Sequence, residues 1–244
     1  MAGKVAIITG AASGLGRSTA IKLAAAEASV FLVDRDLAGL EQTAALIGED
    51  AAIHVADLSD PASCGETVTA AVERFGRLDA LCNVAGLIIM ANSHDMPPEQ
   101  LQRTLAVNLA APFLLSAAAI PHLLETSGAI VNVASSAAFI GEAYAAAYCA
   151  SKAGLVGMTK AMAMEYVHQN IRINAVAPGG MHTNIAANMQ FPEGADFALV
   201  KRYSGLRGLV EVDDVADMIC LLSSPAGRGY HGACITIDGG ITAG

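Results

Sequence analysis

The chain has 244 residues, of which 54% are hydrophobic and 15% are charged. This composition supplies enough apolar surface for a large buried core and excludes a disordered chain. The formal net charge is −9. A protein that binds the phosphate backbone of nucleic acid needs clustered Lys and Arg, so we expect no nucleic-acid partner.

The five cysteines are scattered, without a Cys-x-x-Cys pair and without a histidine at zinc-site spacing. The sequence therefore predicts neither a disulfide framework nor a bound metal. Residues 1–10 run directly into a strand-like segment and show no secretory signal. These features favour a protein of the reducing cytoplasm.

Short apolar segments alternate with longer segments of helical spacing along the whole chain. Uninterrupted apolar segments are typical of parallel strands that are covered on both faces. We expect seven strands, at residues 5–9, 30–33, 52–55, 80–84, 129–133, 172–176 and 234–237. We expect helices at residues 15–27, 37–47, 62–75, 99–124, 147–168 and 212–222. This order predicts an α/β protein with a Rossmann-type, doubly wound parallel sheet and helices on both faces.

Residues 104–124 contain no charged side chain and are numerous enough to raise the question of a membrane span. The stretch includes Asn108, Ser116 and His122, and polar groups at the centre of a span are costly in lipid. We therefore expect no membrane contact and a helix that is buried against a neighbouring subunit.

No linker or shift in composition divides the chain, so we expect a single catalytic domain over residues 1–244. Residues 182–208 are rich in Met, Gly and Asn and form too long a stretch for a plain connection. This segment is expected to be a substrate loop or lid.

A glycine-rich turn, Thr9 to Gly16, follows the first predicted strand. Its glycines would let the backbone approach a pyrophosphate at the start of the next helix, although an isolated turn of this kind is equally consistent with an ordinary tight turn. Asp34 ends the second strand, where a carboxylate can accept hydrogen bonds from an adenosine ribose. The ends of the next two strands should line the same crevice. The residues expected to bind a dinucleotide there are Gly10, Ser13, Gly14, Leu15, Gly16, Asp34, Asp57, Leu58, Asn83, Ala85 and Gly86.

Tyr148 and Lys152 are four residues apart and therefore one turn apart on one helical face. A surface pair is the simpler explanation, but the flanking residues are alanine-rich and nearly uncharged. A tyrosine base must have a pKa roughly 2 to 3 below its usual value, and a nearby cation lowers a pKa by about 1 to 3. We expect Lys152 and an oxidised nicotinamide to do this together. Ser135 follows the fifth strand, where its hydroxyl could hold a substrate oxygen.

These motifs together resemble the short-chain dehydrogenase/reductase family, in its compact form, over essentially the whole chain. The family turn T-G-x-x-x-G-x-G lies at Thr9 to Gly16, N-x-A-G at Asn83 to Gly86, and Y-x-x-x-K at Tyr148 to Lys152. Further matches are a Pro-Gly pair with a later Thr and a terminal D-G-G, at Pro178, Gly179, Thr183, Asp238, Gly239 and Gly240.

The resemblance implies reversible hydride transfer between a nicotinamide cofactor and a secondary alcohol or ketone. It makes Tyr148 the acid/base, with Lys152 lowering its pKa and binding the nicotinamide ribose. Ser135, with Ser136 as the less favoured candidate, would orient the substrate oxygen. Asn108 would hold a water that connects Lys152 to solvent. The resemblance also adds to the cofactor site Tyr148, Lys152, Pro178, Gly179, Met181 and Thr183.

Two alternatives to a dehydrogenase of small alcohols are open. Relatives that reduce 3-oxoacyl thioesters on an acyl carrier protein meet an acidic partner, which favours basic residues near the cleft. Residues 122–129 contain no Lys or Arg, and the chain is acidic, which argues against this alternative. A dinucleotide-binding sensor or scaffold without turnover would need only the glycine turn and Asp34, so the complete catalytic set argues against it too.

The expected substrate pocket is mostly apolar, with no cluster of basic residues that would attract an anion. A medium-sized apolar or cyclic secondary alcohol is therefore the favoured substrate. The residues expected to line this pocket are Ile88, Ile89, Met90, His94, Phe139, Ile140, Tyr144, Met181, Ile185, Met189 and Phe191.

The residues around Asp34 predict NAD in preference to NADP. A 2′-phosphate about 4 Å from this carboxylate would be repelled by roughly 4 kcal/mol at an effective dielectric constant near 20. Arg35 could offset part of that repulsion, but Asp36 is expected to compete for its guanidinium. Ser13 stands where relatives that prefer NADP often carry a basic residue.

The uncharged helix at 104–124 and the alanine-rich helix at 147–168 would give a monomer an unusually large exposed apolar patch. The family commonly pairs these two helices across a two-fold axis, so we expect a homotetramer.

Overall fold

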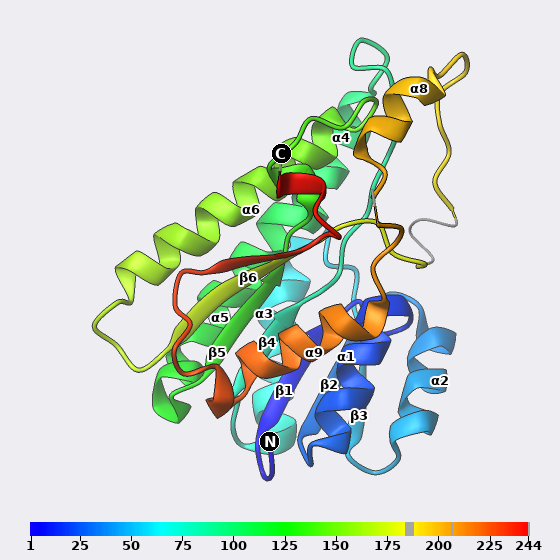
Figure 1. The fold of residues 1–244 in the computed structure, drawn as a ribbon. Helices are drawn as coiled ribbons and strands as arrows, with labels where there is room; N and C mark the ends of the chain where they lie inside the picture. The colour runs from blue at the N-terminus through cyan, green and yellow to red at the C-terminus, as the bar shows by residue number, and fades with distance from the viewer. Residues whose placement is uncertain (184–187, 206, 244) are drawn as a thin grey trace.

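The computed structural model describes residues 1–183, 188–205 and 207–243. Its centre is a seven-stranded parallel sheet in the order β3-β2-β1-β4-β5-β6-β7 (Figure 1). The strands lie where the sequence predicts them, apart from small shifts at their ends: β1 Val5–Thr9, β2 Ser29–Asp34, β3 Ala51–Val55, β4 Ala80–Asn83, β5 Ala129–Val133, β6 Arg172–Pro178 and β7 Cys234–Ile237. The predicted fold class is confirmed.

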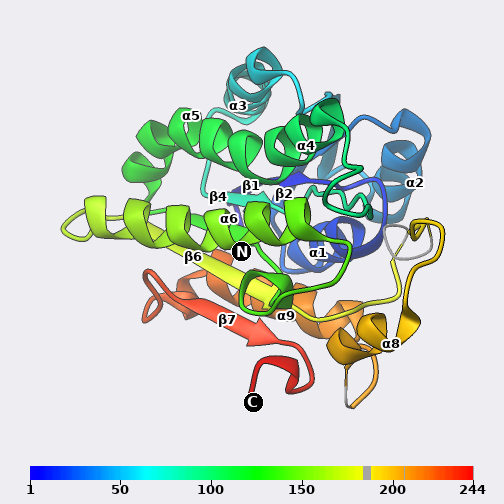
Figure 2. The ribbon, with the colours of Figure 1, turned by 90° about the horizontal axis from the view of Figure 1, so that it is seen from above.

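Helices cover both faces of the sheet, as Figure 2 shows from above. On one face lie α3 Pro61–Phe75, α5 Ala111–Thr126 and α6 Ala146–Glu165. On the other lie α1 Gly14–Ala25, α2 Leu37–Ile47 and α9 Val212–Ser223. Short 3-10 turns complete the described elements, at Ser136–Ala138, Lys201–Tyr203, Pro225–Gly227 and Ile241–Ala243.

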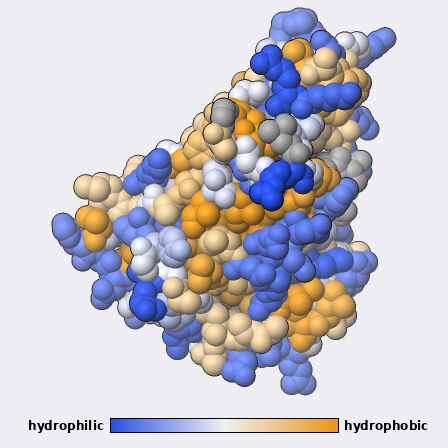
Figure 3. All heavy atoms as spheres, viewed as in Figure 1, coloured by the Kyte–Doolittle hydropathy of each residue, from blue (hydrophilic) through white to orange (hydrophobic). Residues whose placement is uncertain are grey.

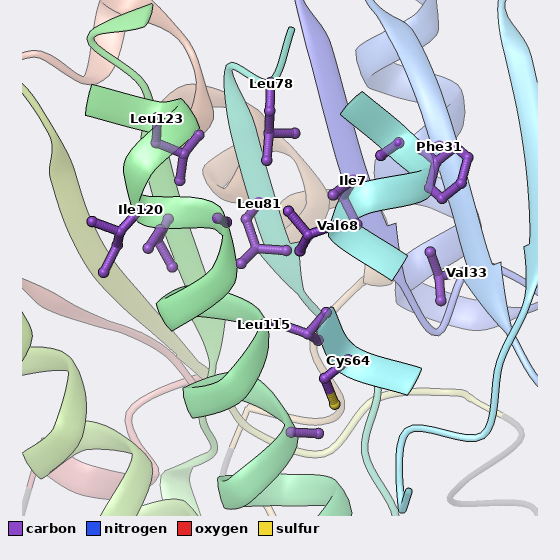
Figure 4. Close-up of a cluster of buried hydrophobic side chains, with 14 of the residues drawn as sticks. Ile7, Phe31, Val33, Cys64, Val68, Leu78, Leu81, Leu115, Ile120 and Leu123 are labelled. Carbon is purple, nitrogen blue, oxygen red and sulfur yellow. The ribbon is translucent and has the colours of Figure 1, made fainter. Parts of the chain in front are cut away.

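Two apolar cores explain why the strands show no alternation of polar and apolar residues. Ile7 packs with the helices of one face, beside Val68 of α3 and Leu115 of α5 (Figure 4). Its neighbours Ala6 and Ile8 point the other way, into the core formed with α1 and α9. Because successive side chains of a strand point to opposite faces, both sets must be apolar when both faces are covered.

Asp60 and Pro61 start α3 as their residue types predict. The Asp60 carboxylate accepts a hydrogen bond from the Ala62 N–H at 3.0 Å, and Pro61 occupies the first helical position. Gly76 ends the helix in the left-handed conformation, with φ 74°.

The long helix predicted at 99–124 is present as a continuous helical run, with one π-helical turn that the sequence did not indicate. It consists of α4 Pro98–Leu105, a π-helical turn at Ala106–Ala110, and α5. A π-turn holds one more residue than an α-helical turn and is rare outside functional sites. Here it carries the buried Asn108. Hydrophobic periodicity does not reveal such a turn, because apolar spacing continues on both sides of it.

The continuous helical run Pro98–Thr126 is long and apolar enough to span a membrane by length and composition. Core helices of folded proteins pass the same test, and 44% of the most apolar window is buried inside the protein. α5 packs against α3 and against β4 and β5 in the same core. The expectation of no membrane contact stays a prediction.

The segment predicted as a lid contains two short elements that its sequence did not indicate. These are α8 Phe197–Val200 and the 3-10 turn at Lys201–Tyr203. Two hydrogen bonds attach the segment to the loop before α6: Asp196 N–H donates to the Tyr144 hydroxyl at 2.8 Å, and the Tyr203 hydroxyl donates to the Ala143 carbonyl at 3.1 Å. Residues 184–187 and 206 lie outside the described residues. Movement of this segment as a lid stays a prediction.

Candidate active site

A cleft of about 450 Å³ lies at the carboxyl ends of the strands. The turn after β1, the ends of β4, β5 and β6, the start of α6 and part of residues 188–205 line it. An adjoining hollow of about 120 Å³ extends it toward Asp34 and Asp57. Figure 3 shows apolar side chains gathered across this face, between the region of α8 and that of α1 and α9. Ligands of open parallel sheets bind at this edge.

The glycine turn brings bare backbone to the floor of the cleft. Gly10 has φ +70°, and a Cβ atom there would lie 3.0 Å from the backbone of Ala85. A Cβ atom on Gly16 would collide with the carbonyl oxygen of Gly10. The Thr9 hydroxyl accepts hydrogen bonds from the N–H groups of Val84 and Ala85 at 2.9 and 3.0 Å, which fixes the turn to the end of β4. This cradle fits a pyrophosphate at the N-terminus of α1.

Asp34 lies at the opening from the cleft into the smaller hollow. One of its carboxylate oxygens accepts a hydrogen bond from the Ala12 N–H at 3.2 Å and the other from the Asp36 N–H at 3.1 Å. Asp57 lines the hollow too, and hydrogen bonds from the N–H and hydroxyl of Ser59 lower its pKa. Both carboxylates therefore face the place expected for an adenosine ribose.

Two arginines, Arg35 and Arg103, also line this hollow. Arg103 belongs to α4, far from the glycine turn in sequence, and no motif indicated it. None of the described ion pairs joins Asp36 to Arg35, so the expected competition for the Arg35 guanidinium is not found among them. Asp36 instead caps α2 by accepting a hydrogen bond from the Gly39 N–H at 3.2 Å, because a helix start offers unpaired N–H donors.

Most of the other expected cofactor residues line the cleft, namely Ser13, Gly14, Leu15, Ala85, Gly86, Pro178, Gly179, Met181 and Thr183, and Leu58 lines the hollow. Asn83 differs from them. Its side chain is buried and donates hydrogen bonds to Asn132 at 2.8 Å and to Ser116 at 3.4 Å. The Asn83 side chain therefore positions the end of β4. The backbone of the residues that follow Asn83 forms the cleft wall.

Lys152 is almost completely buried, at 3% exposed. Its ammonium group donates a hydrogen bond to the Val133 carbonyl at 2.7 Å and lies 5.8 Å from the centre of the Tyr148 ring. Burial lowers the pKa of Lys152 to about 8. The ammonium form therefore still predominates at neutral pH.

The pKa of Tyr148 lies above its usual value in the protein alone. Burial raises it to about 12, and a hydrogen bond with the Ser135 hydroxyl offsets only part of this effect. The lowering expected from Lys152 together with an oxidised nicotinamide stays a prediction. Ser135 in turn accepts a hydrogen bond from the Ala137 N–H at 3.2 Å, which orients its hydroxyl at the cleft. Ser136 lines the cleft beside it.

The Asn108 side chain joins the loop after β4 to α6. Its oxygen accepts from the Leu87 N–H at 2.9 Å, and its amide nitrogen donates to the Leu87 carbonyl at 2.8 Å and to the Ser151 hydroxyl at 3.1 Å. Because both amide hydrogens are engaged, the side chain positions the cleft wall. The water relay expected of Asn108 stays a prediction.

The expected substrate wall is present in part. Of its residues, Ile88, Met181, Met189 and Phe191 line the cleft, whereas Ile89, Met90, His94, Phe139, Ile140 and Tyr144 are not among the described lining residues. Ile185 lies outside the described residues. Sequence reasoning missed Glu142 and Tyr203, which line the cleft as well. Neither belongs to a motif, and they are 61 positions apart in sequence.

Residues 4–193 match the short chain dehydrogenase family. The chain belongs to this family. Both the resemblance and the expectation of an oxidoreductase that acts on alcohols are thereby confirmed. The cradle at Gly10 and Gly16, the carboxylate of Asp34 and the Ser135, Tyr148 and Lys152 set match what a short-chain dehydrogenase needs to hold a nicotinamide dinucleotide.

Three comparisons place the chain within the family. It is 38% identical to trans-4-hydroxycyclohexanecarboxylate dehydrogenase of Sinomonas cyclohexanicum, over 100% of this chain and 95% of the relative. It is 35% identical to D-threitol dehydrogenase of Mycolicibacterium smegmatis, over 98% and 93%. The crystal structure of 3-ketoacyl-(acyl-carrier-protein) reductase from Brucella melitensis, complexed with NADH, matches it with a TM-score of 0.89 and 34% identity over 99% of both chains.

Proposed function

We propose that this short-chain dehydrogenase is an NAD-dependent enzyme that oxidises small secondary alcohols and reduces the corresponding ketones. The observation that carries the proposal is the convergence of Ser135, Tyr148 and Lys152 on one cleft with the glycine cradle. The dinucleotide would supply the hydride acceptor or donor. The protein would supply binding, orientation and the proton.

Binding of the dinucleotide would use the whole length of the cleft. The backbone of Gly14 and Leu15 at the start of α1 would face the pyrophosphate, with the adenosine ribose at Asp34. The nicotinamide end would lie in the part of the same cleft that is lined by Pro178, Gly179, Thr183 and Tyr148. This arrangement would leave the substrate between the nicotinamide and the apolar wall.

The proton step would take place at the Tyr148 hydroxyl. In the oxidative direction, Tyr148 would take the proton of the substrate hydroxyl while Ser135 holds the same oxygen by a hydrogen bond. For this the pKa of Tyr148 has to fall from about 12. The Lys152 ammonium is held close to the ring by Val133, and a positive charge there stabilises the phenolate. In the reductive direction, the same groups return the proton.

The choice of NAD over NADP rests on Asp34. Its carboxylate lies at the ribose end of the cleft, where a 2′-phosphate would meet a like charge. Arg35 and Arg103 line the same hollow and would offset part of the repulsion. The NADH bound in the Brucella melitensis structure supports the same choice.

The mainly apolar wall supports a small alcohol, and the names of the two relatives, which refer to a polyol and to a cyclic alcohol that carries a carboxylate, support that size class. The Brucella melitensis structure favours reduction of a 3-oxoacyl thioester as a second candidate. The net charge of −9 and the lack of Lys and Arg at 122–129 weigh against an acidic carrier protein as partner. A cytoplasmic location fits either activity.

A homotetramer is proposed on the basis of apolar side chains left exposed on the two helices that the family pairs. Phe113 on α5 is 49% exposed and Met164 on α6 is 72% exposed, with Val167 just beyond α6 at 47%. Exposed apolar side chains of this size on two neighbouring helices are typical of subunit interfaces.

Replacement of Tyr148 tests the proposed function. Turnover of a panel of secondary alcohols with NAD should fall at least about 100-fold in Tyr148→Phe, while NADH binding, followed by fluorescence, persists. Tyr166→Phe, at the end of α6 and outside the cleft, is the matched control and should keep full activity. A sensor or scaffold would show no turnover in the unsubstituted protein, and unchanged activity in Tyr148→Phe would disprove the mechanism.

A further inference from the structure

Glu142 is a carboxyl group in the part of the cleft that the substrate would occupy. It lines the cleft together with Ser135 and Tyr148, and Tyr148 follows it six positions later in the sequence. The surrounding wall is apolar, formed by Ile88, Met181, Met189, Phe191, Val200 and Leu209. A charged group is costly in such a setting unless it has a partner.

Among the described residues, the Glu142 carboxyl has neither an ion pair nor a side-chain hydrogen bond. Loss of hydration alone raises its pKa to about 7. Its backbone, in contrast, is used by the fold, since its carbonyl accepts a hydrogen bond from the Ala145 N–H at 3.2 Å. The carboxyl lines the cleft and has no such role among the described residues.

The cleft also contains the groups that a substrate would meet beside Glu142. Ser135 and Tyr148 would hold the reacting oxygen, and Tyr203 lines the same cleft. The negative charge of Glu142 contributes to the raised pKa of both Tyr148 and Tyr203. A substrate bound at Ser135 and Tyr148 would thus bring its neighbouring carbon atoms to Glu142.

We propose that Glu142 determines substrate specificity by accepting a hydrogen bond from a second hydroxyl group of the substrate. This makes diols and other polyhydroxylated secondary alcohols the preferred substrate class. It also disfavours alcohols that carry a carboxylate, because that charge would lie near Glu142. The inference rests on the proposed function, since it assumes that the alcohol is oxidised at Tyr148.

Three cyclohexane compounds separate these effects, because they share one ring. Cyclohexanediols offer a second hydroxyl, cyclohexanol has none, and 4-hydroxycyclohexanecarboxylate carries an anion. For the unsubstituted enzyme with NAD, we expect kcat/KM for at least one cyclohexanediol to exceed that for cyclohexanol about tenfold or more, as a hydrogen bond to a charged group provides. The carboxylate should be the poorest substrate of the three.

Two substitutions test the role of the carboxyl. Glu142→Leu should lower kcat/KM for the diol about tenfold or more while leaving cyclohexanol unchanged or improved. Glu142→Gln keeps an acceptor but removes the charge, so it should retain more diol activity and improve turnover of the carboxylate. Glu193→Gln, which removes the same charge from an exposed position outside the cleft lining, is the matched control and should behave as the unsubstituted enzyme.

The pH dependence of the diol to cyclohexanol ratio gives an independent readout. Other titratable groups near the substrate would affect the turnover of both alcohols, so the ratio of the two kcat/KM values removes much of their influence. These groups are Tyr148, Lys152, His182 and Tyr203, which line the cleft, and Cys149 beside Glu142. The ratio should rise as the pH increases through about 7, where Glu142 becomes ionised. It should be flat in Glu142→Gln.

The outcomes distinguish this inference from the proposed function. Turnover of cyclohexanol with equal or better efficiency than all diols, and no change of that ratio in Glu142→Leu, would overturn the role of Glu142 while leaving the dehydrogenase intact. If the unsubstituted enzyme oxidised no alcohol of the set, the proposed function would fail and this inference with it.

Discussion

The Lys152 ammonium donates a hydrogen bond to the carbonyl oxygen of Val133, at a distance of 2.7 Å. Val133 is the last residue of β5, and Lys152 lies one turn after Tyr148 on α6. This hydrogen bond therefore connects the central sheet to the helix that carries the proposed acid/base, as does the one that the Asn132 amide donates to the Thr159 hydroxyl at 2.9 Å. It also holds a buried positive charge in a fixed position beneath the cleft.

Replacing Lys152 should separate catalysis from stability. In Lys152→Met, kcat/KM should fall about 100-fold or more, because the positive charge beside Tyr148 is lost. The free energy of unfolding should change by less than about 2 kcal/mol, since relief from burying an ammonium offsets the lost hydrogen bond. Urea unfolding and steady-state kinetics provide the two measurements. Lys160→Met, at an exposed position of the same helix, is the control. A large loss of stability in Lys152→Met but not in Lys160→Met would show that the role of Lys152 is mainly structural.

Asp34 should set the choice of cofactor. We expect kcat/KM with NAD to be at least about tenfold higher than with NADP, since like charges repel at the ribose end. In Asp34→Ser the preference should narrow or reverse. Adding Arg35→Ala or Arg103→Ala to Asp34→Ser should lower the efficiency with NADP again, because both arginines line that hollow. Equal efficiency with both cofactors in the unsubstituted protein would show that Asp34 does not govern the site.

The glycine turn should tolerate no side chain at Gly16. In Gly16→Ala, the new methyl group would meet the Gly10 carbonyl, so NADH binding should weaken at least about tenfold and the Tm should fall. Gly65→Ala is the matched control: it lies inside α3, where a Cβ atom meets nothing within 4 Å. That substitution should stabilise the protein by about 0.5 to 1 kcal/mol. Equal effects of the two, measured by thermal unfolding and fluorescence titration, would contradict the close packing of the turn.

Light scattering at micromolar concentration should give a mass four times the 24.8 kDa of the monomer. Phe113→Glu and Met164→Glu should each lower this mass, because a charge on an apolar interface opposes association. Leu46→Glu, on α2 and 65% exposed, is the control and should leave the mass unchanged. A monomer mass for the unsubstituted protein would remove the proposed tetramer.

The parts of the fold that sequence predicts well are those determined by local patterns. Strand β1 is recognisable because Val5 to Thr9 is apolar throughout, as burial on both faces requires. The cofactor turn is recognisable because its glycines are close in sequence and the turn leaves no room for a side chain, as at Gly16, where a Cβ atom would collide with the Gly10 carbonyl. Tyr148 and Lys152 are recognisable because four residues make one helical turn.

Features created by contacts between distant segments escaped prediction. Arg103 and Asp34 line one hollow, and Glu142 and Tyr203 line one cleft, only in the folded chain. The π-turn at Ala106–Ala110 has no signal in apolar spacing. The pKa of Tyr148 depends on how deeply the folded protein buries its hydroxyl, which a pair of residue types does not specify.

The two hydrogen bonds from Asp196 to Tyr144 and from Tyr203 to Ala143 join the segment over the cleft to the loop that carries Glu142. The segment at 196–203 and the loop that carries Glu142 are therefore held together, so a displacement of the segment displaces the carboxyl as well. Changes at residues 196–199, none of which lines the cleft, would thus retune which alcohols the enzyme accepts without replacing a group that would touch the substrate. Loss of both tyrosine hydroxyls would release the segment from the loop and leave entry and selection as separate events.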